Sequence, residues 1–306
     1  MFKSFMQTLM WGTLNQHVNG LNPVVIENES ASCLFSFDKK NRLLTSFNGP
    51  VINKHITLHA FQNFLEKIYH FTHNNKIDYI NLKSLFPLRQ WAPWIEEELI
   101  KSGFARQEWK TLIVDLTSTQ EALLKSFEHS ARKGIKKAQS HGVQVERCDT
   151  FEEYFSKFLI PYFKSTNRAL KEKEFYRKGW DLDSENVYNY WISKSFEGEL
   201  LGFLGTFRYD GLATEIMSAL TPLAFEKKIP VQDLLHWEIM NYHKDLGDTY
   251  FDLAGFNPNP ISEKEKNIKR FKEKWGGEIF DISSYIFDNR SFGQKVISRI
   301  RAKLHE

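Results

Sequence analysis

The sequence is short of several features that would define a class of protein. Only two cysteines, Cys33 and Cys148, occur in 306 residues, which excludes a disulfide framework or a thiolate zinc site built from this chain. No apolar run approaches the roughly 18 residues that span a bilayer. The N-terminus has Lys3 but no uninterrupted apolar core followed by small residues, as a signal peptide requires. We therefore expect a reduced, cytoplasmic protein.

Several sequence motifs of common enzyme classes are also missing. There is no G-x-S-x-G, H-E-x-x-H, G-x-x-x-x-G-K-[ST] or G-x-G-x-x-G, which argues against serine hydrolases, zincins, P-loop enzymes and Rossmann oxidoreductases. His55/His59 and His70/His73 have the spacing of metal ligands, but neither pair has an evident third ligand, so we expect no metal site. The net charge of +3 does not indicate a nucleic-acid binder, and we expect no DNA partner.

The composition is that of a globular protein with room for two cores. Hydrophobic residues make up 42% and charged residues 26% of the chain, proportions typical of soluble domains. A chain of this length can form two domains. Aromatic residues reach 15%, which favours large buried side chains.

Hydrophobic periodicity predicts the same order of elements twice: strand, strand, helix, strand, helix, strand. In the first half these are strands at 32–37 and 42–47, a helix at 56–72, a strand at 77–82, a helix at 92–102 and a strand at 108–116. In the second half they are strands at 200–209 and 212–220, a helix at 231–246, a strand at 250–254, a helix at 262–275 and a strand at 278–287. We therefore expect an α/β (α+β) fold with mixed sheets, in two similar domains packed together.

The predicted domains are residues 1–117 and 118–306, with 118–186 as a connecting helical segment. Ser118 and Glu121 have capping-box spacing and predict a helix that continues to about Ala138, with Gly134 as the point where it kinks or splits. The charged stretch 167–178 is expected to be a loop.

Two basic clusters are candidate substrate or phosphate sites. Arg132, Lys133 and Lys136 lie in one predicted helix, and Arg gives bidentate contacts to phosphate where Lys gives a point charge. Lys227 and Lys228 precede the helix predicted from residue 231, where free backbone N–H groups favour anions. A solvated surface is the alternative for each cluster.

The segment around Lys272 and the strand around Asp252 supply the candidate catalytic residues. Phe271 and Trp275 are four residues apart and anchor one face of a predicted helix, which fixes the direction of Lys272. An ammonium at a binding site can stabilise the oxyanion of a tetrahedral intermediate. Asp252, like Glu215, lies within a predicted strand, where burial favours a general base. We select Lys272, Phe271 and Asp252 as catalytic candidates, although a surface lysine and carboxylates bonded to backbone donors are the alternatives.

The C-terminal residues 291–305 predict an amphipathic helix. Its apolar stripe lies beside basic side chains, and is formed by Phe292, Val296, Ile297, Ile300 and Leu304. Such a helix docks on the protein's own core or makes a peripheral contact with an anionic membrane.

Four segments together resemble the Fem-type (FemABX) peptidoglycan aminoacyltransferases, relatives of the GNAT acyltransferase superfamily. They are Trp109–Val145, which includes Ser130–Ala138, then Leu234–Glu238, Phe251–Gly255 and Arg270–Gly277. The resemblance extends over about residues 109–280, and it implies two tandem GNAT-like domains along nearly the whole chain.

The resemblance also implies an activity. Members of the family transfer an aminoacyl group from aminoacyl-tRNA, or their relatives an acyl group from acyl-CoA, to an amine of an envelope precursor such as a lipid-linked peptidoglycan intermediate. The donor is a co-substrate, so no tightly bound cofactor is expected, and charged tRNA is a possible partner. In the family a lysine of the Phe-Lys segment is implicated in catalysis, which corresponds here to Lys272 beside Phe271. Basic residues hold acceptor phosphates, which corresponds to Arg132, Lys133 and Lys136, and Arg270 is a further candidate.

Two departures from the family leave the donor open. Residues 116–186 are too few for the long helical hairpin of some members, and residues 221–233 do not have the glycine pattern of CoA-binding GNAT enzymes. The alternatives are an acyl-CoA-dependent N-acetyltransferase that acts on a sugar or polysaccharide precursor, and a non-catalytic tandem-GNAT binding protein.

Overall fold

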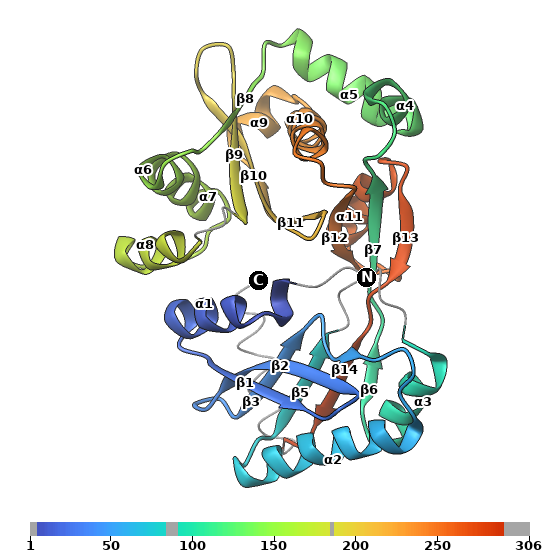
Figure 1. Cartoon of the computed structure of the whole chain (residues 1–306). Helices are drawn as coiled ribbons and strands as arrows, with labels where there is room; N and C mark the ends of the chain where they lie inside the picture. The colour runs from blue at the N-terminus through green and yellow to red at the C-terminus, as the bar shows by residue number, and fades with distance from the viewer. Residues whose placement is uncertain (1–4, 84–90, 184–186, 291–306) are drawn as a thin grey trace. The chain divides into compact units, whose positions relative to one another are not determined.

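The structure is a computed structural model that describes residues 5–83, 91–183 and 187–290, and the chain divides into two compact units (Figure 1). The first consists of the residues up to Trp109 together with those from Asp281 onward, and the second is Lys110–Phe280. Each unit contains one mixed sheet and its own apolar core. The predicted α/β fold with mixed sheets is confirmed.

The first unit is built on a sheet with the strand order β1-β2-β3-β5-β14-β6, and β4 pairs with β2. Strands β3 and β5 are parallel, and the other neighbours are antiparallel. The strands are β1 (Asn22–Glu27), β2 (Ala31–Asp38), β3 (Leu43–Phe47), β4 (Val51–Ile52), β5 (Tyr79–Lys83), β6 (Ala105–Gln107) and β14 (Ser284–Asp288). The helices are η1 (Phe5–Gln7), α1 (Leu9–Asn19), α2 (Leu58–Asn74) and α3 (Pro93–Lys101).

Helix α2 forms the core of this unit with the sheet. Its N-terminus is capped by Thr57, whose side chain accepts a hydrogen bond from the Ala60 N–H. The side chains of one helix face are buried, namely Phe61, Phe64, Leu65, Ile68 and Thr72. The helix therefore follows from its cap and from an apolar face at helical spacing.

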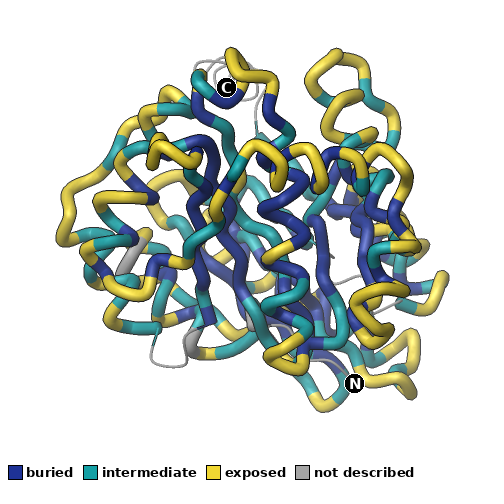
Figure 2. The backbone as a smooth tube through the Cα atoms, turned by 90° about the horizontal axis from the view of Figure 1, so that it is seen from above, coloured by how far each residue is buried: buried dark blue, intermediate teal, exposed yellow. Residues whose placement is uncertain are grey.

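The second unit has a sheet with the order β13-β7-β12-β11-β10-β9-β8. Its strands are β7 (Lys110–Asp115), β8 (Gln144–Arg147), β9 (Tyr188–Lys194), β10 (Leu200–Tyr209), β11 (Leu212–Leu220), β12 (Tyr250–Phe256) and β13 (Glu278–Asp281). Its helices are α4 (Gln120–Ser126), α5 (His129–Ser140), α6 (Phe151–Glu153), η2 (Tyr154–Leu159), α7 (Ile160–Ser165), α8 (Lys173–Leu182), α9 (Pro222–Lys227), α10 (Val231–Asp245) and α11 (Glu263–Glu273). Figure 2 shows buried backbone gathered in the interior and exposed backbone at the periphery.

The two faces of this sheet bury different side chains. Leu204 of β10 belongs to the core under α5 and α10, whereas its neighbour Phe203 belongs to an aromatic cluster under η2 and α7. In that cluster the Tyr154 ring is stacked on Tyr190 at 4.0 Å and on Trp180 at 5.1 Å between ring centroids. The period of two along β10 therefore supplies two separate layers.

The units do not divide after residue 117, where the repeat placed the domain boundary. The strand predicted at 108–116 corresponds to β7, which pairs with β12 in the second sheet, while the short β6 just before it joins the first. The strand predicted at 278–287 is likewise two strands, β13 in the second sheet and β14 in the first. A strand pattern shows that a segment is extended, but it does not show which sheet the segment joins.

The connecting segment also differs from its prediction. Two helices replace the single one expected, because Phe127 is extended (φ −72°, ψ 151°) between α4 and α5. Its buried ring packs edge-on against Trp237 and Trp275, which favours a break there. Gly134 lies inside α5 and does not interrupt it. The stretch 167–178, predicted as a loop, contains the first part of helix α8.

None of the described helices is both long and apolar enough to cross a membrane. The amphipathic helix predicted at 291–305 lies outside the described residues.

Gly276 gives a test of the packing between the end of α11 and the end of α4. It has φ +64°, and a Cβ there would lie 2.2 Å from the Ser126 carbonyl oxygen. Gly198 has φ +84° with nothing within 4 Å of an added Cβ. A left-handed conformation alone costs an alanine about 1–2 kcal/mol. We expect Gly198→Ala to lose about that much free energy of unfolding, and Gly276→Ala to lose at least about twice as much, because its backbone must also shift. Equal losses in urea denaturation would contradict this packing.

Candidate active site where two strands part

Strands β11 and β12 are parallel neighbours for three residue pairs and then part. The last pair is Thr214 and Asp252. Beyond it, β11 stays paired with β10 as far as Leu220, and β12 stays paired with β7 as far as Phe256. The register of β12 shifts at this point, where Ala254 has φ +62°. Backbone carbonyls at this point are therefore not used in regular hydrogen bonding between β11 and β12, and nearby side chains can approach them.

Four ionisable side chains gather at this point. Asp252 of β12 belongs to the last strand pair, and Glu215 of β11 follows it directly. His236 comes from α10 and Lys272 from α11. His236 contacts Glu215, and the positive charge of Lys272 acts on both carboxylates. Three of them are buried, with Lys272 8% exposed, Asp252 5% and His236 1%, and the Glu215 side chain is 10% exposed. The structure thus brings together two of the residues that the sequence selected, Lys272 and Asp252.

Lys272 is held by backbone oxygens at the shifted register of β12. Its Nζ donates hydrogen bonds to the carbonyls of Ala254 at 3.1 Å and Gly255 at 2.9 Å. Burial lowers the pKa of Lys272, and the nearby charges of Glu215 and Asp252 oppose this effect. An ammonium has three hydrogens. One remains for a ligand after the two carbonyls are satisfied.

Asp252 is a buried carboxylate with neutral donors. It accepts hydrogen bonds from the Thr111 hydroxyl and, at 2.8 Å, from the Ala254 N–H. Burial raises the pKa of Asp252 to about 6, although these two hydrogen bonds and Lys272 act in the opposite direction. A carboxyl group in this range can exchange a proton near neutral pH.

His236 and Glu215 share a proton. The Nδ1 atom of His236 is 2.7 Å from the Gln232 carbonyl oxygen, so Nδ1 carries a hydrogen. The Nε2 atom is 3.1 Å from Glu215 Oε2, and a lone pair cannot face a carboxylate there. One proton must therefore lie between imidazole and carboxylate. Burial opposes the charge of Glu215, but the hydrogen bond and charge of His236, the charge of Lys272 and a hydrogen bond from Ser218 together lower the pKa of Glu215.

Aromatic rings surround the His236 imidazole. The Phe271 ring packs at 5.0 Å and the fully buried Trp275 ring is stacked at 5.4 Å, both between ring centroids. Phe271 was selected as catalytic from the sequence, and the structure shows it as a wall beside His236. The Lys274 ammonium lies 4.2 Å from the Phe271 centroid and forms an ion pair with the buried Asp233. The Asp233 side chain of this pair packs directly against Gly134 of α5, where no Cβ could fit.

The basic residues predicted on α5 lie elsewhere on the unit. Arg132 donates to the carbonyls of Lys125 and Phe127 and so caps the end of α4. Lys133 and Lys136 are exposed on the outer face of α5. In the described part of the chain, no hydrogen bond or ion pair joins these residues to the four-residue cluster.

The other predicted basic residues are also on the surface. Lys227 forms an ion pair with Glu199 of the β9–β10 turn, and Lys228 ends α9 in the left-handed conformation. The Lys228 carbonyl accepts a hydrogen bond from Lys137 of α5 at 3.2 Å. Arg270 is exposed on α11.

His236 was not predicted as a member of the site, although it lies in the segment Leu234–Glu238 that carries part of the family resemblance. Glu215 was considered but not selected. A signal was present: Gln232, His236 and His243 lie at helical spacing, on the same face of the helix as apolar residues. Polar residues on the buried face of a helix need partners, and this requirement points to a site.

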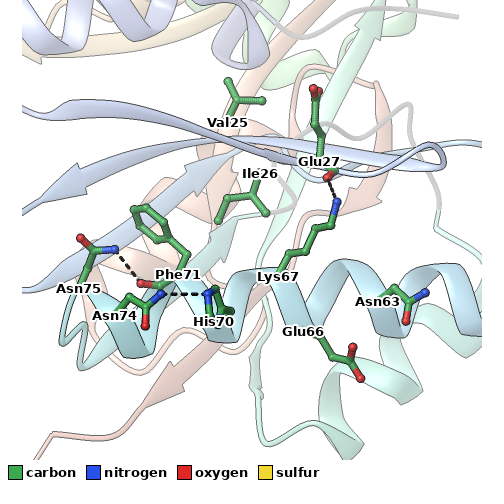
Figure 3. Close-up of a pocket in the computed structure, with 10 residues that line it drawn as sticks. All are labelled: Val25, Ile26, Glu27, Asn63, Glu66, Lys67, His70, Phe71, Asn74 and Asn75. Carbon is green, nitrogen blue, oxygen red and sulfur yellow. Dashed lines mark hydrogen bonds between the residues drawn. The ribbon is translucent and has the colours of Figure 1, made fainter.

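A hollow of about 860 Å³ lies in the first unit, between β1 and α2 (Figure 3). Part of its polar lining is already engaged: Lys67 donates to the Glu27 carbonyl at 2.8 Å, and the His70 ring contacts Asn74 at 3.0 Å. It is lined by none of the predicted site residues. Among the residues that the structure describes, no three histidine, cysteine or acidic side chains are grouped to hold a metal ion.

The raised pKa of Asp252 predicts how Asp252→Asn changes stability with pH. Below about pH 4 the carboxyl is protonated in both the folded and the unfolded chain. As pH rises toward and through 6, only the unfolded chain ionises freely, so the parent loses stability. The asparagine variant has no carboxyl group to ionise and does not lose stability in this way. We therefore expect the difference in free energy of unfolding between variant and parent to change in favour of the variant by up to about 3 kcal/mol between pH 4 and pH 7. A difference that stays constant in urea denaturation across this range would contradict the assignment.

Known proteins share the fold of this chain, and a known family matches part of its sequence. Residues 100–188 match the FemAB family. This segment contains β6, β7 and the helices from α4 to α8, but not the four-residue cluster. No curated protein matches the chain in sequence.

Solved structures resemble nearly the whole chain. FemX has a TM-score of 0.70 with 14% identity, over 98% of this chain and 95% of FemX. L-PGS from Bacillus licheniformis has a TM-score of 0.61 with 12% identity, over 96% and 91%. A tandem GNAT protein from the clavulanic acid biosynthesis pathway has a TM-score of 0.58 with 9% identity, over 86% and 80%. The chain therefore has the tandem GNAT-like fold of these proteins and resembles the FemAB family over residues 100–188.

Proposed function

We propose that this protein transfers an aminoacyl or acyl group from an activated ester or thioester to an amine of a cell-envelope precursor. The FemAB match and the fold shared with FemX and L-PGS support a transferase. The observation that carries the proposal is the cluster of Lys272, Glu215, Asp252 and His236 where β11 and β12 part. It combines a buried cation with proton-accepting groups.

The chemistry requires both kinds of group. The acceptor amine attacks the donor carbonyl, a C–N bond forms, and the C–O or C–S bond to the leaving group breaks. The attacking nitrogen loses a proton, for which Asp252 is a suitable acceptor. The leaving oxygen or sulfur takes a proton up, and the His236–Glu215 pair holds one that it can supply. The third hydrogen of the Lys272 ammonium is available to the oxyanion of the tetrahedral intermediate. Positioning of the two substrates supplies much of the remaining rate enhancement.

Exposed basic side chains serve substrate phosphates in this proposal. Lys133, Lys136 and Arg270 are exposed, and Lys228 precedes the N-terminus of α10. Arg132 and Lys227 already have partners within the unit, so in addition to contacting phosphates they hold α4 and α9 in place. Charged tRNA and acyl-CoA both carry phosphates that such residues can bind.

An acyl-CoA-dependent N-acetyltransferase is the second candidate. The parting of β11 and β12 favours it, because β11 beyond Thr214 turns one edge away from β12 and can offer backbone groups to an amide-containing chain. The shared fold of GNAT proteins is consistent with either donor.

The role of Lys272 is tested by comparing it with another lysine of α11. Lys269 also donates to a backbone carbonyl, that of Pro258 at 3.1 Å, but it lies outside the cluster. We expect Lys272→Met to lower kcat by about 100-fold or more, as removal of an oxyanion donor does, and Lys269→Met to keep it within about twofold. The assay follows a radiolabelled aminoacyl group from charged tRNA and, separately, an acetyl group from acetyl-CoA, to peptidoglycan-precursor amines.

The stability of the variants is measured alongside. Lys272→Met leaves two buried carboxylates without their cation, so its melting temperature is expected to fall, and kcat is compared at a temperature where each variant is folded. Full activity of folded Lys272→Met would remove Lys272 from the site. Transfer from neither donor to any amine by the parent would contradict the proposed function.

A further inference from the structure

Helix α10 is fixed to the sheet by a row of buried polar side chains. Gln232 donates from Nε2 to the carbonyls of Phe203 at 3.2 Å and Ala219 at 2.9 Å, which are paired residues of β10 and β11. His236, one turn later, contacts Glu215 of β11. His243, two further turns along, contacts Thr206 of β10. One face of the helix therefore spans the same two strands with three polar groups.

The last of these groups belongs to a hydrogen-bonded chain of four residues, of which Arg208 is partly exposed. The His243 Nδ1 atom lies 2.9 Å from Asp248 Oδ2, and Nε2 lies 3.0 Å from the Thr206 hydroxyl. Arg208 donates to both Asp248 oxygens at 2.9 Å. Since Asp248 only accepts, the imidazole donates from Nδ1 and accepts from Thr206. A neutral ring satisfies every partner, and burial lowers the pKa of His243 accordingly.

The order of hydroxyl, imidazole and carboxylate is that of a nucleophilic triad, but the location excludes this use. A triad serine or threonine must reach a substrate carbonyl. Thr206 and His243 are each 0% exposed, and Thr206 lies on β10, which is flanked by β9 and β11. The Thr206 hydroxyl and the His243 imidazole therefore have no access to a substrate.

This hydrogen-bonded chain adjoins the candidate active site through the sheet. Thr206 and Glu215 are directly opposite each other on β10 and β11, at the shift in register that follows Gly205. His243 and His236 reach down to these opposite residues from positions about 10 Å apart along α10. The position of α10 along its axis therefore decides whether His236 meets Glu215.

We infer that the chain of Thr206, His243, Asp248 and Arg208 positions helix α10, and so holds the His236 imidazole against Glu215 in the active site. Apolar contacts under α10 are not directional and tolerate small shifts along the helix axis. Hydrogen bonds are directional, and a fully satisfied buried network favours a single arrangement. The four residues are positioning residues, and the catalytic meaning of the arrangement rests on the proposed function.

The environment of Glu215 supplies a readout that needs no substrate. His236 faces it from α10, Lys272 from α11, Asp252 from β12 and Tyr162 from α7. His236 donates a hydrogen bond to Glu215 from α10, and Ser218 donates one from β11 itself. If α10 shifts, the bond from His236 lengthens while the contacts from the other elements remain, so the carboxylate becomes harder to ionise.

The test uses Thr206→Val and His243→Gln in the full chain. Valine keeps the shape of threonine but removes the hydroxyl, and glutamine does not reproduce the contact with Asp248. Carboxyl ¹³C spectra of glutamate-labelled protein, assigned with Glu215→Gln, follow the titration of Glu215. Histidine ring ¹⁵N spectra, assigned with His236→Gln, report the His236 hydrogen bonds. We expect both variants to shift the titration midpoint of Glu215 upward and to change the Nε2 signal of His236.

A matched control separates positioning from general loss of stability. Ile239 is 0% exposed on the same helix but belongs to the apolar core, so Ile239→Ala destabilises α10 without removing a polar contact. We expect this variant to leave both signals of Glu215 and His236 unchanged at a comparable loss of melting temperature. Unchanged signals in folded Thr206→Val would overturn the inference, as would an equal change in Ile239→Ala. If His243→Gln does not fold, Thr206→Val alone decides.

A transfer assay distinguishes this inference from the proposed function. If the parent transfers an aminoacyl or acyl group, Thr206→Val is expected to lower kcat about tenfold with KM nearly unchanged, and to move the acidic limb of the pH profile upward. If the parent has no activity, the proposed function fails, while the spectra still decide whether the chain positions His236.

Discussion

The second unit depends on one ammonium that takes the place of solvent for two buried carboxylates. Lys272 lies between backbone carbonyls released by the shifted register of β12 and the acidic groups of Glu215 and Asp252. Without a cation, carboxylates at this depth would be expensive to ionise. Without the carbonyls, the cation itself would be unsatisfied. The register shift of β12, the burial of Lys272 on α11 and the charges of the two carboxylates therefore depend on one another.

Much of the architecture could be predicted from local patterns. The periodic helices α2, α10 and α11 and the adjacent strands β10 and β11 lie where the sequence placed them, within a few residues. Their signals depend on neighbours in sequence. The break at Phe127 could not be predicted in this way, because it is caused by packing against Trp237 and Trp275, which are more than a hundred residues away. Gly134 was predicted to kink or split its helix, but the glycine is needed there because a Cβ would collide with the Asp233 side chain.

The site shows the same limit. Lys272 and Asp252 were selected by residue type, flanking pattern and family resemblance, and they do lie together. His236 was not, because its importance depends on the carbonyl of Gln232 at one nitrogen and on Glu215 at the other. The basic residues of α5 were selected by their charge and by the family resemblance, and Arg132 proves to bind the end of α4. Charge in a sequence indicates what a side chain can bind, whereas the fold decides what it meets.

The first unit is discontinuous in sequence, since its strand β14 is contributed after the whole second unit. That strand lies between β5 and β6, and β6 is paired with no other strand in the described part of the first sheet. During synthesis, the N-terminal sheet therefore stays incomplete until residues 284–288 have left the ribosome. By then the second unit is already fully synthesised, and the sheet that begins the chain becomes the last to be finished.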